Sequence, residues 1–169
     1  MNRVVLEIAH TWDGQPVEIA ERATVCFHAE NSHLVVKVDA PFHDDPAHSG
    51  PPGSLWKLWQ WEVVELFIAT TSESYTEIEL GPYGHFLVLT FKGARNIVSH
   101  GHRIQHRAER HGGRWRGQAL VSLALIPDRP WRVNAYAIHG RSTQRRYLAT
   151  EPVPGAQPDY HQLQYFRWV

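Results

Sequence analysis

The sequence has almost no cysteine, no excess of charge of either sign and no long apolar run. Its 169 residues contain one cysteine, Cys26, which excludes an internal disulfide framework and a zinc site built from cysteines. Because 17 Lys+Arg balance 17 Asp+Glu, we expect no bulk electrostatic attraction to nucleic acid or to an anionic membrane. No run of 18 apolar residues occurs, and Glu7 interrupts the first apolar stretch, so neither a membrane span nor a signal peptide is expected. These absences predict a soluble, cytoplasmic protein with no nucleic-acid or membrane partner.

Short segments of alternating apolar and polar residues dominate the chain. No segment has a sustained period of 3.6 residues, and 12 Gly with 11 Pro interrupt the sequence at short intervals. The spacing predicts about ten strands, the density typical of a sandwich or barrel. We therefore predict an all-β fold, a single antiparallel β-sandwich domain over residues 1–169. The expected strands cover residues 25–29, 34–38, 61–68, 75–80, 86–91, 103–110, 114–125, 133–139, 145–149 and 163–168. Residues 122–126 fit a helical turn as well as a strand. A second helical turn is a candidate near residues 55–59.

Three glutamates fall on matching positions of two neighbouring predicted strands. Glu77 and Glu79 must share one face of their strand because side chains alternate between the two faces. On the preceding strand, alternate side chains form one more apolar face, and Glu65 lies on the opposite face. If the two strands pair, the three carboxylates lie on one face of the sheet within a few residues of each other. Like charges so close imply arginine neighbours, raised pKa values, a bound cation or hydrogen bonds from ligand hydroxyls.

Tryptophans cluster beside the longest irregular stretch of the sequence. Trp56, Trp59 and Trp61 follow the Pro- and Gly-rich loop 41–54, and a loop of that length in a compact domain is often functional. Tryptophan side chains more often fill cores, so we expect two of the three to be buried. One exposed tryptophan would suffice to stack on a sugar ring.

The histidines and the one basic block give no comparable signal. None of the 12 histidines has the spacing of a metal motif such as H-E-x-x-H. His100-Gly101-His102 and the group around Asp44-Asp45 are only weak candidates for a metal site. We therefore predict no metal and no cofactor. Residues 100–116 carry five Arg and four His against one Glu. Because the charge is spread over two strands of a predicted hairpin and no recognition helix is present, this block is typical of a solvated sheet edge that discourages aggregation.

Several strings in their order and spacing resemble uncharacterised protein family 0462, which has bacterial and vertebrate members. That family is similar to the family 9 carbohydrate-binding modules, which are β-sandwiches. The resemblance implies the same fold, with Glu65, Glu77, Glu79 and Asn134 as polar lining of a ligand site and a nearby tryptophan as its platform. Trp61-Glu62 departs from the pair of Asp found in many such modules. The strings are His10-Thr11-Trp12-Asp13-Gly14, Ala40-Pro41-Phe42, Trp61-Glu62-Val63-Val64-Glu65, Tyr75-Thr76-Glu77-Ile78-Glu79-Leu80 with Pro82 and Gly84, residues 134–140, Pro158-Asp159-Tyr160-His161 and Tyr165-Phe166.

We predict non-catalytic binding of a carbohydrate or a similar polyhydroxylated small ligand. Stacking on Trp56 or Trp59 would combine with hydrogen bonds, and Arg141 or Arg145 would balance the charge. One alternative is a metal-assisted or two-carboxylate hydrolase, and another is a scaffold that binds a protein. The oligomeric state stays open. The candidate ligand-binding residues are Trp56, Trp59, Glu65, Glu77, Glu79, Asn134, His139, Arg141, Arg145 and His161, and the hydrolase would use the three glutamates with His139 and His161.

Overall fold

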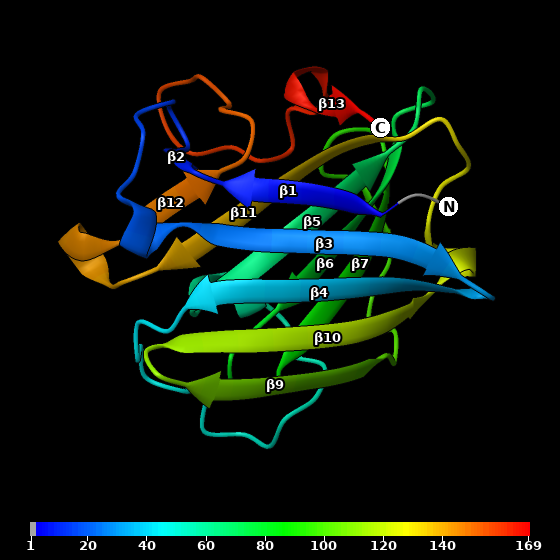
Figure 1. Ribbon diagram of the computed structural model, residues 1–169. Coiled ribbons are helices and arrows are strands. Elements are labelled where there is room, and N and C mark those ends of the chain that lie inside the picture. Colours follow the sequence, from blue (N-terminus) through cyan, green and yellow to red (C-terminus); the bar gives the residue numbers. More distant parts are fainter. Residues whose placement is uncertain (1–2) are drawn as a thin grey trace.

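Two antiparallel sheets pack face to face in the computed structural model, which describes residues 3–169 (Figure 1). The first sheet has five strands, and all of its neighbouring pairs are antiparallel. Its order across the sheet is β1 (Val4–Ile8), β3 (Ala23–Glu30), β4 (His33–Pro41), β10 (Arg114–Ser122) and β9 (Gln105–His111). The basic block forms β9 and the start of β10, and β9 is an edge strand, as predicted for a solvated edge.

The second sheet has eight strands and holds the candidate site. Three consecutive strands, residues 63–69, 74–80 and 86–92, pair in chain order as an antiparallel meander. The prediction of an all-β antiparallel sandwich is therefore confirmed. Across the sheet the order is β2 (His10–Thr11), β12 (Arg146–Ala149), β11 (Arg132–His139), β5 (Val63–Ala69), β6 (Ser74–Leu80), β7 (Phe86–Lys92) and β8 (Ile97–Ser99), with β13 (Arg167–Trp168) paired to β11.

In the described part of the chain, residues 3–169, helical structure is limited to 3-10 turns of three residues. The strand expected over 114–125 ends at Ser122, whose hydroxyl accepts a hydrogen bond from the backbone N–H of Ala124 and so begins a turn. The prediction of a strand over 163–168 was wrong for its first half, because residues 163–165 also form a turn. Within residues 3–169, no helix has the length and apolar character needed to cross a membrane. The turns are η1 (Ile19–Glu21), η2 (Leu58–Gln60), η3 (Leu123–Leu125), η4 (Ser142–Gln144) and η5 (Leu163–Tyr165).

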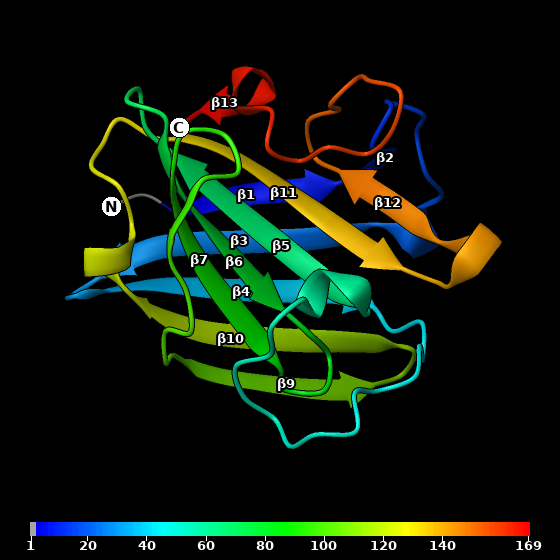
Figure 2. The same cartoon turned by 180° about the vertical axis from the view of Figure 1, so that it is seen from behind.

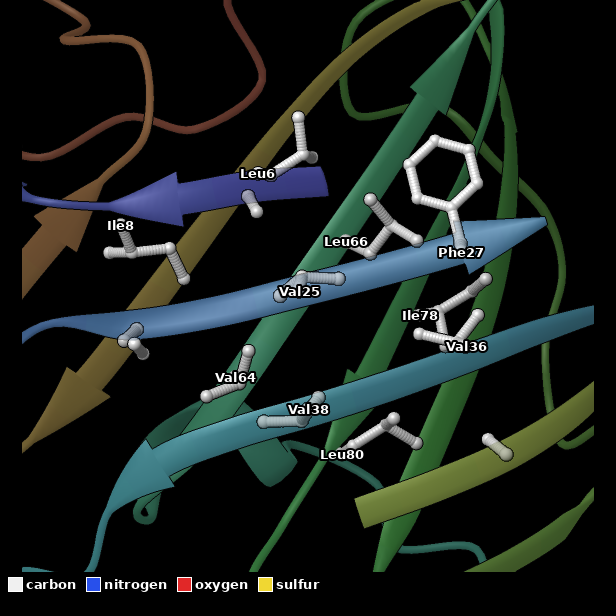
Figure 3. Packing of buried hydrophobic residues seen from close by; sticks show 14 of the residues in the cluster. Leu6, Ile8, Val25, Phe27, Val36, Val38, Val64, Leu66, Ile78 and Leu80 are labelled. Carbon is white, nitrogen blue, oxygen red and sulfur yellow. The ribbon is translucent and has the colours of Figure 1, made fainter. Parts of the chain in front are cut away.

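The main core lies between the two sheets. Alternate side chains of β1, β3 and β4 point toward β5 and β6, as Figure 3 shows for Val25 and Phe27 on one side and Leu66 on the other. These three side chains are at most 1% exposed. Burial of each aliphatic or aromatic side chain contributes about 1.5–3 kcal/mol, so this layer is the principal source of stability.

The second sheet also carries a buried layer on its outer face. Phe67, Tyr75 and Tyr136 belong to this layer, and Tyr160 and Phe166 from the C-terminal segment pack on it. Figure 2 shows, on this side of the sheet, the η2 turn and the chain between β12 and β13. Because both faces of β5 are covered, every residue from Val63 to Ala69 is buried. Polar residues on the outer face of β5 and β6 are consequently enclosed instead of solvated.

Candidate functional site

Glu65, Glu77 and Glu79 lie together in the outer layer of the second sheet. In the register of β5 and β6, Glu65 is opposite Glu79 and Phe67 is opposite Glu77, so the three glutamates share the face that strand alternation predicts. One carboxylate oxygen of each lies within 4.8 Å of the others. Their exposed fractions are 2%, 4% and 0%, respectively. The sequence prediction that they form one cluster is therefore matched by their positions.

Burial controls the electrostatics of this cluster. Loss of hydration raises the pKa of Glu77 to about 7 and raises the pKa of Glu65 and of Glu79 well above the usual value for a glutamate. The charge of Glu77 adds to the increase for the other two, whereas the guanidinium of Arg145 opposes the increase in the pKa of Glu65. The cluster therefore holds protons at a pH where an exposed glutamate is ionised.

A cavity of about 370 Å³ opens onto two of these carboxylates. We call it the glutamate cavity. Most of its wall is aromatic or aliphatic, and its polar groups are few, which is the usual character of a small-molecule site. The volume is near the lower end of the range for such sites, about 300–1,000 Å³. Its lining residues are Trp59, Glu65, Phe67, Glu77, Leu89, Phe91, Arg95, Ile97, Ile138, Tyr147, Pro158, Asp159, Tyr160 and His161.

The η2 turn positions Trp59 at this cavity. Lys57 precedes the turn in the left-handed backbone conformation, with φ at 64°, and Trp59 then lines the cavity. Trp56 is 47% exposed, does not line the cavity, and contacts Trp59 edge-on with ring centroids 5.5 Å apart. Of the two tryptophans proposed as platforms, Trp59 is therefore the one placed to meet a ligand.

His161 reaches the cavity from the C-terminal segment. The hydroxyl of Tyr75 lies 2.8 Å from Nδ1 of His161 and accepts a hydrogen bond from the backbone N–H of Arg95. Burial lowers the pKa of His161 to about 4, and the charge of Arg95 contributes, so the imidazole is neutral at pH 7. A neutral ring with Nδ1 accepting from Tyr75 carries its proton on Nε2.

Arg95 and Asp159 are cavity residues that the sequence interpretation missed. They form an ion pair of 2.5 Å at the cavity, next to His161. Asp159 stands in the string Pro158-Asp159-Tyr160-His161 that supports the family resemblance, so a signal for it was present in the sequence. Arg95 lies between β7 and β8 and has no distinguishing neighbour in the sequence.

Asn134 has a structural environment. Its side-chain amide donates to the hydroxyl of Tyr136 and to the carbonyl of Glu151, both at 2.8 Å, and its carbonyl oxygen accepts from the backbone N–H groups of Ala135 and Glu151, both at 2.9 Å. It is 0% exposed and does not line the glutamate cavity. With two donated and two accepted hydrogen bonds, it ties the segment after β12 to β11.

Of the two predicted arginines, Arg145 influences the glutamate cluster, and Arg141 lies elsewhere. Arg145 donates to the backbone carbonyls of Gly140, Trp59 and Trp61 at 2.9, 2.6 and 3.3 Å, so it supports the η2 turn that carries Trp59. Arg141 is exposed and, with Arg145, lines a separate hollow of about 160 Å³. Neither arginine forms a wall of the glutamate cavity.

His139 is on the other face of the second sheet. Ile138 faces the glutamate cavity, so the next residue of β11 points the opposite way. His139 stacks on His43 with ring centroids 3.4 Å apart and lies 3.2 Å from a carboxylate oxygen of Glu21. The set proposed for a hydrolase is therefore not brought together as a whole, since only His161 joins Glu65 and Glu77 at the cavity.

A larger hollow, about 660 Å³, lies on the outer face of the first sheet. Its charged groups are partly paired, because Asp39 accepts from Nε of Arg114 at 2.6 Å and from Nε of Arg116 at 3.0 Å. These side chains are substantially exposed, and exposed ion pairs of this kind contribute little energy. The glutamate cavity differs because two of its carboxyl groups, those of Glu65 and Glu77, are buried and form no ion pair within residues 3–169.

No family model matches the sequence, but individual proteins do. The chain is 38% identical over 173 residues to the mouse protein "UPF0462 protein C4orf33 homolog", and the match covers 95% of this chain and 88% of the mouse protein. The zebrafish protein of the same name is 37% identical, with coverage of 95% and 85%, and human "UPF0462 protein C4orf33" is 36% identical with the same coverage.

Solved structures with a similar fold have little sequence in common with the chain. A proposed carbohydrate-binding protein of Bacteroides uniformis superposes with a TM-score of 0.72 at 10% identity, covering 98% of this chain and 84% of that one. A family 9 carbohydrate-binding module of Caldicellulosiruptor kristjanssonii, solved with cellotriose, gives a TM-score of 0.49 at 12% identity, covering 76% and 65%. At this level of identity, the first superposition shows a shared architecture alone.

Proposed function

The chain belongs to the UPF0462 family, and from the glutamate cavity we propose that it binds a carbohydrate or similar polyhydroxylated small molecule without transforming it. The observation that carries the proposal is a cavity with apolar walls whose polar groups include two buried carboxyl groups, those of Glu65 and Glu77. A sugar has hydroxyl groups around an otherwise apolar ring, so it can satisfy both parts of such a surface.

Each wall of the cavity has a defined part in this proposal. Trp59 and Tyr147 offer aromatic surface against the C–H groups of a ring, and Glu65 and Glu77 accept hydrogen bonds from its hydroxyl groups. A protonated carboxyl group can also donate to a hydroxyl oxygen, and each such hydrogen bond contributes about 0.5–1.5 kcal/mol net. A small cavity of about 370 Å³ suits one sugar unit or a small polyol better than a long chain.

The two alternatives from the sequence fit this geometry less well. A protein-binding scaffold predicts no cavity at the acidic face, whereas one is present. A hydrolase using both histidines loses His139, which lies on the opposite side of the sheet. A cytoplasmic location and the absence of a nucleic-acid partner stay predictions from composition.

A ligand panel tests the proposal. Calorimetric titration of the protein with neutral hexoses, pentoses and alditols is expected to reveal millimolar binding of at least one of them. Trp59→Ala and Glu77→Gln are each expected to weaken that binding at least about tenfold, since tenfold corresponds to about 1.4 kcal/mol.

The matched control is Trp168→Ala, because Trp168 is 56% exposed and does not line the cavity. Its affinity is expected to equal that of the wild type. Failure of every panel member to bind, or equal binding by Trp59→Ala, would contradict the proposal. Hydrolysis of an aryl glycoside by the wild type and its loss in Glu77→Gln would replace non-catalytic binding with the hydrolase alternative.

A further inference from the structure

The three glutamates lack the counter-charges that buried carboxylates normally have. Within residues 3–169, none of them forms an ion pair with Lys, Arg or His. Both carboxylate oxygens of Glu79 and one of Glu77 are buried without a hydrogen-bond partner in this part of the chain. A buried carboxyl oxygen without a hydrogen-bond partner is unfavourable even when the group is protonated, so a ligand that satisfies these oxygens would stabilise the cluster.

The arginine that influences this cluster makes its hydrogen bonds elsewhere. Arg145 influences the pKa of Glu65, but its guanidinium already donates to three backbone carbonyls around the η2 turn. It therefore holds the position of Trp59 and offers no hydrogen bond to the cluster. Within residues 3–169, no arginine forms an ion pair with any of the three glutamates.

The spacing and the chemistry of the oxygens are compatible with a divalent metal ion. One oxygen of each glutamate lies within 4.8 Å of the others. Calcium binds oxygen at about 2.3–2.6 Å, so two oxygens on opposite sides of the ion are about 4.6–5.2 Å apart. Magnesium binds at about 2.0–2.1 Å, usually keeps several of its waters and is held by one or two carboxylates, so a buried set of three carboxylates suits Ca²⁺ better. All three ligands are carboxylates, which hard cations prefer, and no histidine or cysteine that zinc would favour belongs to the cluster.

We propose that Glu65, Glu77 and Glu79 together bind one divalent cation of the size of Ca²⁺ at the floor of the glutamate cavity. Glu79, which is fully buried and does not line the cavity, forms the inner side of the site. Glu65 and Glu77 form the side that faces the cavity. Two positive charges against three carboxylates leave one negative charge, and Arg145 lies near enough to reduce it further.

The cation also adds to the proposed ligand recognition. Ca²⁺ takes six to eight oxygen ligands, and three carboxylates that are partly bidentate leave positions open toward the cavity. Adjacent hydroxyl groups of a polyol can fill those positions. This step rests on the proposed function, whereas binding of the cation does not.

A direct titration tests the site. Wild-type protein treated with a chelator and dialysed is titrated with CaCl₂ by calorimetry, and with Tb³⁺, whose emission is sensitised by a nearby tryptophan such as Trp59. We expect one saturable site per chain, Tb³⁺ emission that Ca²⁺ displaces, and affinity for Ca²⁺ reduced at least about tenfold in Glu79→Gln and in Glu77→Gln.

The matched control is Glu30→Gln, an exposed carboxylate at the end of β3, which is expected to keep the affinity of the wild type. Urea unfolding of each variant verifies folding, and Glu65→Gln replaces any variant that fails this check. Absence of saturable binding by the wild type at millimolar Ca²⁺ would overturn the proposal. So would unchanged affinity in folded Glu79→Gln and Glu77→Gln.

The same samples separate this inference from the proposed function. Sugar binding that is unchanged after chelation would leave the proposed function standing and would remove the role of the cation in it. Binding of Ca²⁺ without binding of any sugar would support the cation site and contradict the proposed function.

Discussion

Replacement of Asn134 by alanine is expected to lower the free energy of unfolding by about 3–5 kcal/mol. The side chain makes four hydrogen bonds, to Tyr136, Ala135 and both backbone groups of Glu151, and it is 0% exposed. Each such bond contributes about 0.5–1.5 kcal/mol net, and alanine leaves the partners buried without replacements, which adds to the loss. Domains of this size are stable by about 5–15 kcal/mol in total, so the effect is large.

Urea unfolding followed by tryptophan fluorescence measures this loss as a lower midpoint at an unchanged slope. The melting temperature is expected to fall by about 10 °C, because about 1 kcal/mol corresponds to about 2–4 °C in a domain of 150–250 residues. The control is Thr150→Val, which removes a buried hydroxyl that has no hydrogen-bond partner within residues 3–169 and keeps a similar shape. It is expected to be neutral or stabilising. A loss below about 1 kcal/mol for Asn134→Ala would refute the structural role assigned to this residue.

Two further substitutions test the loops beside the site. Burial, with Asp45 and Asp44 contributing, raises the pKa of Glu62 to about 7 from an ordinary value of 4.5. The folded protein therefore binds this proton more tightly than the unfolded chain does. The stability of the wild type relative to Glu62→Gln is expected to be greatest below pH 4.5 and to fall as the pH rises to 7. Urea unfolding of both proteins at pH 5 and pH 8 checks this, and the same difference at both values would count against it. Gly140→Ala is expected to lose at least about 2 kcal/mol, because φ is 78° and a Cβ would overlap the carbonyl oxygen of Gln144. Gly93→Ala, with φ at 80° and no neighbour in reach, should lose less, and equal losses would contradict the role of that overlap.

Strand alternation made much of the fold and the centre of the site predictable. It predicted the segments that form β3 and β4 and those that form β5 to β7, and it predicted the common face of Glu65, Glu77 and Glu79. The same rule applied to β11 would have separated Asn134 from His139, because an even and an odd position of one strand face opposite ways. Treating both as ligand residues overlooked that parity.

Some elements gave too little local signal. Strands β2 and β13 have two residues each and β8 has three, so no alternation can be recognised in them. Strand β1 is longer, and its buried side chains, Leu6 and Ile8, alternate as a strand requires. The sequence interpretation tested this segment only as a signal peptide and so missed the strand. A metal motif such as H-E-x-x-H lies within one continuous segment, whereas the three glutamates come from two strands.

The sequence by itself determined which side chains share a face, because the alternation of a strand is a property of consecutive residues. Tertiary structure decided that this face is enclosed. Trp59, Arg95 and His161 reach the glutamate cavity from three loops separated by up to about a hundred residues, and each is held there by contacts with other segments. Such contacts depend on apolar surface buried between distant parts of the chain, which no local pattern records.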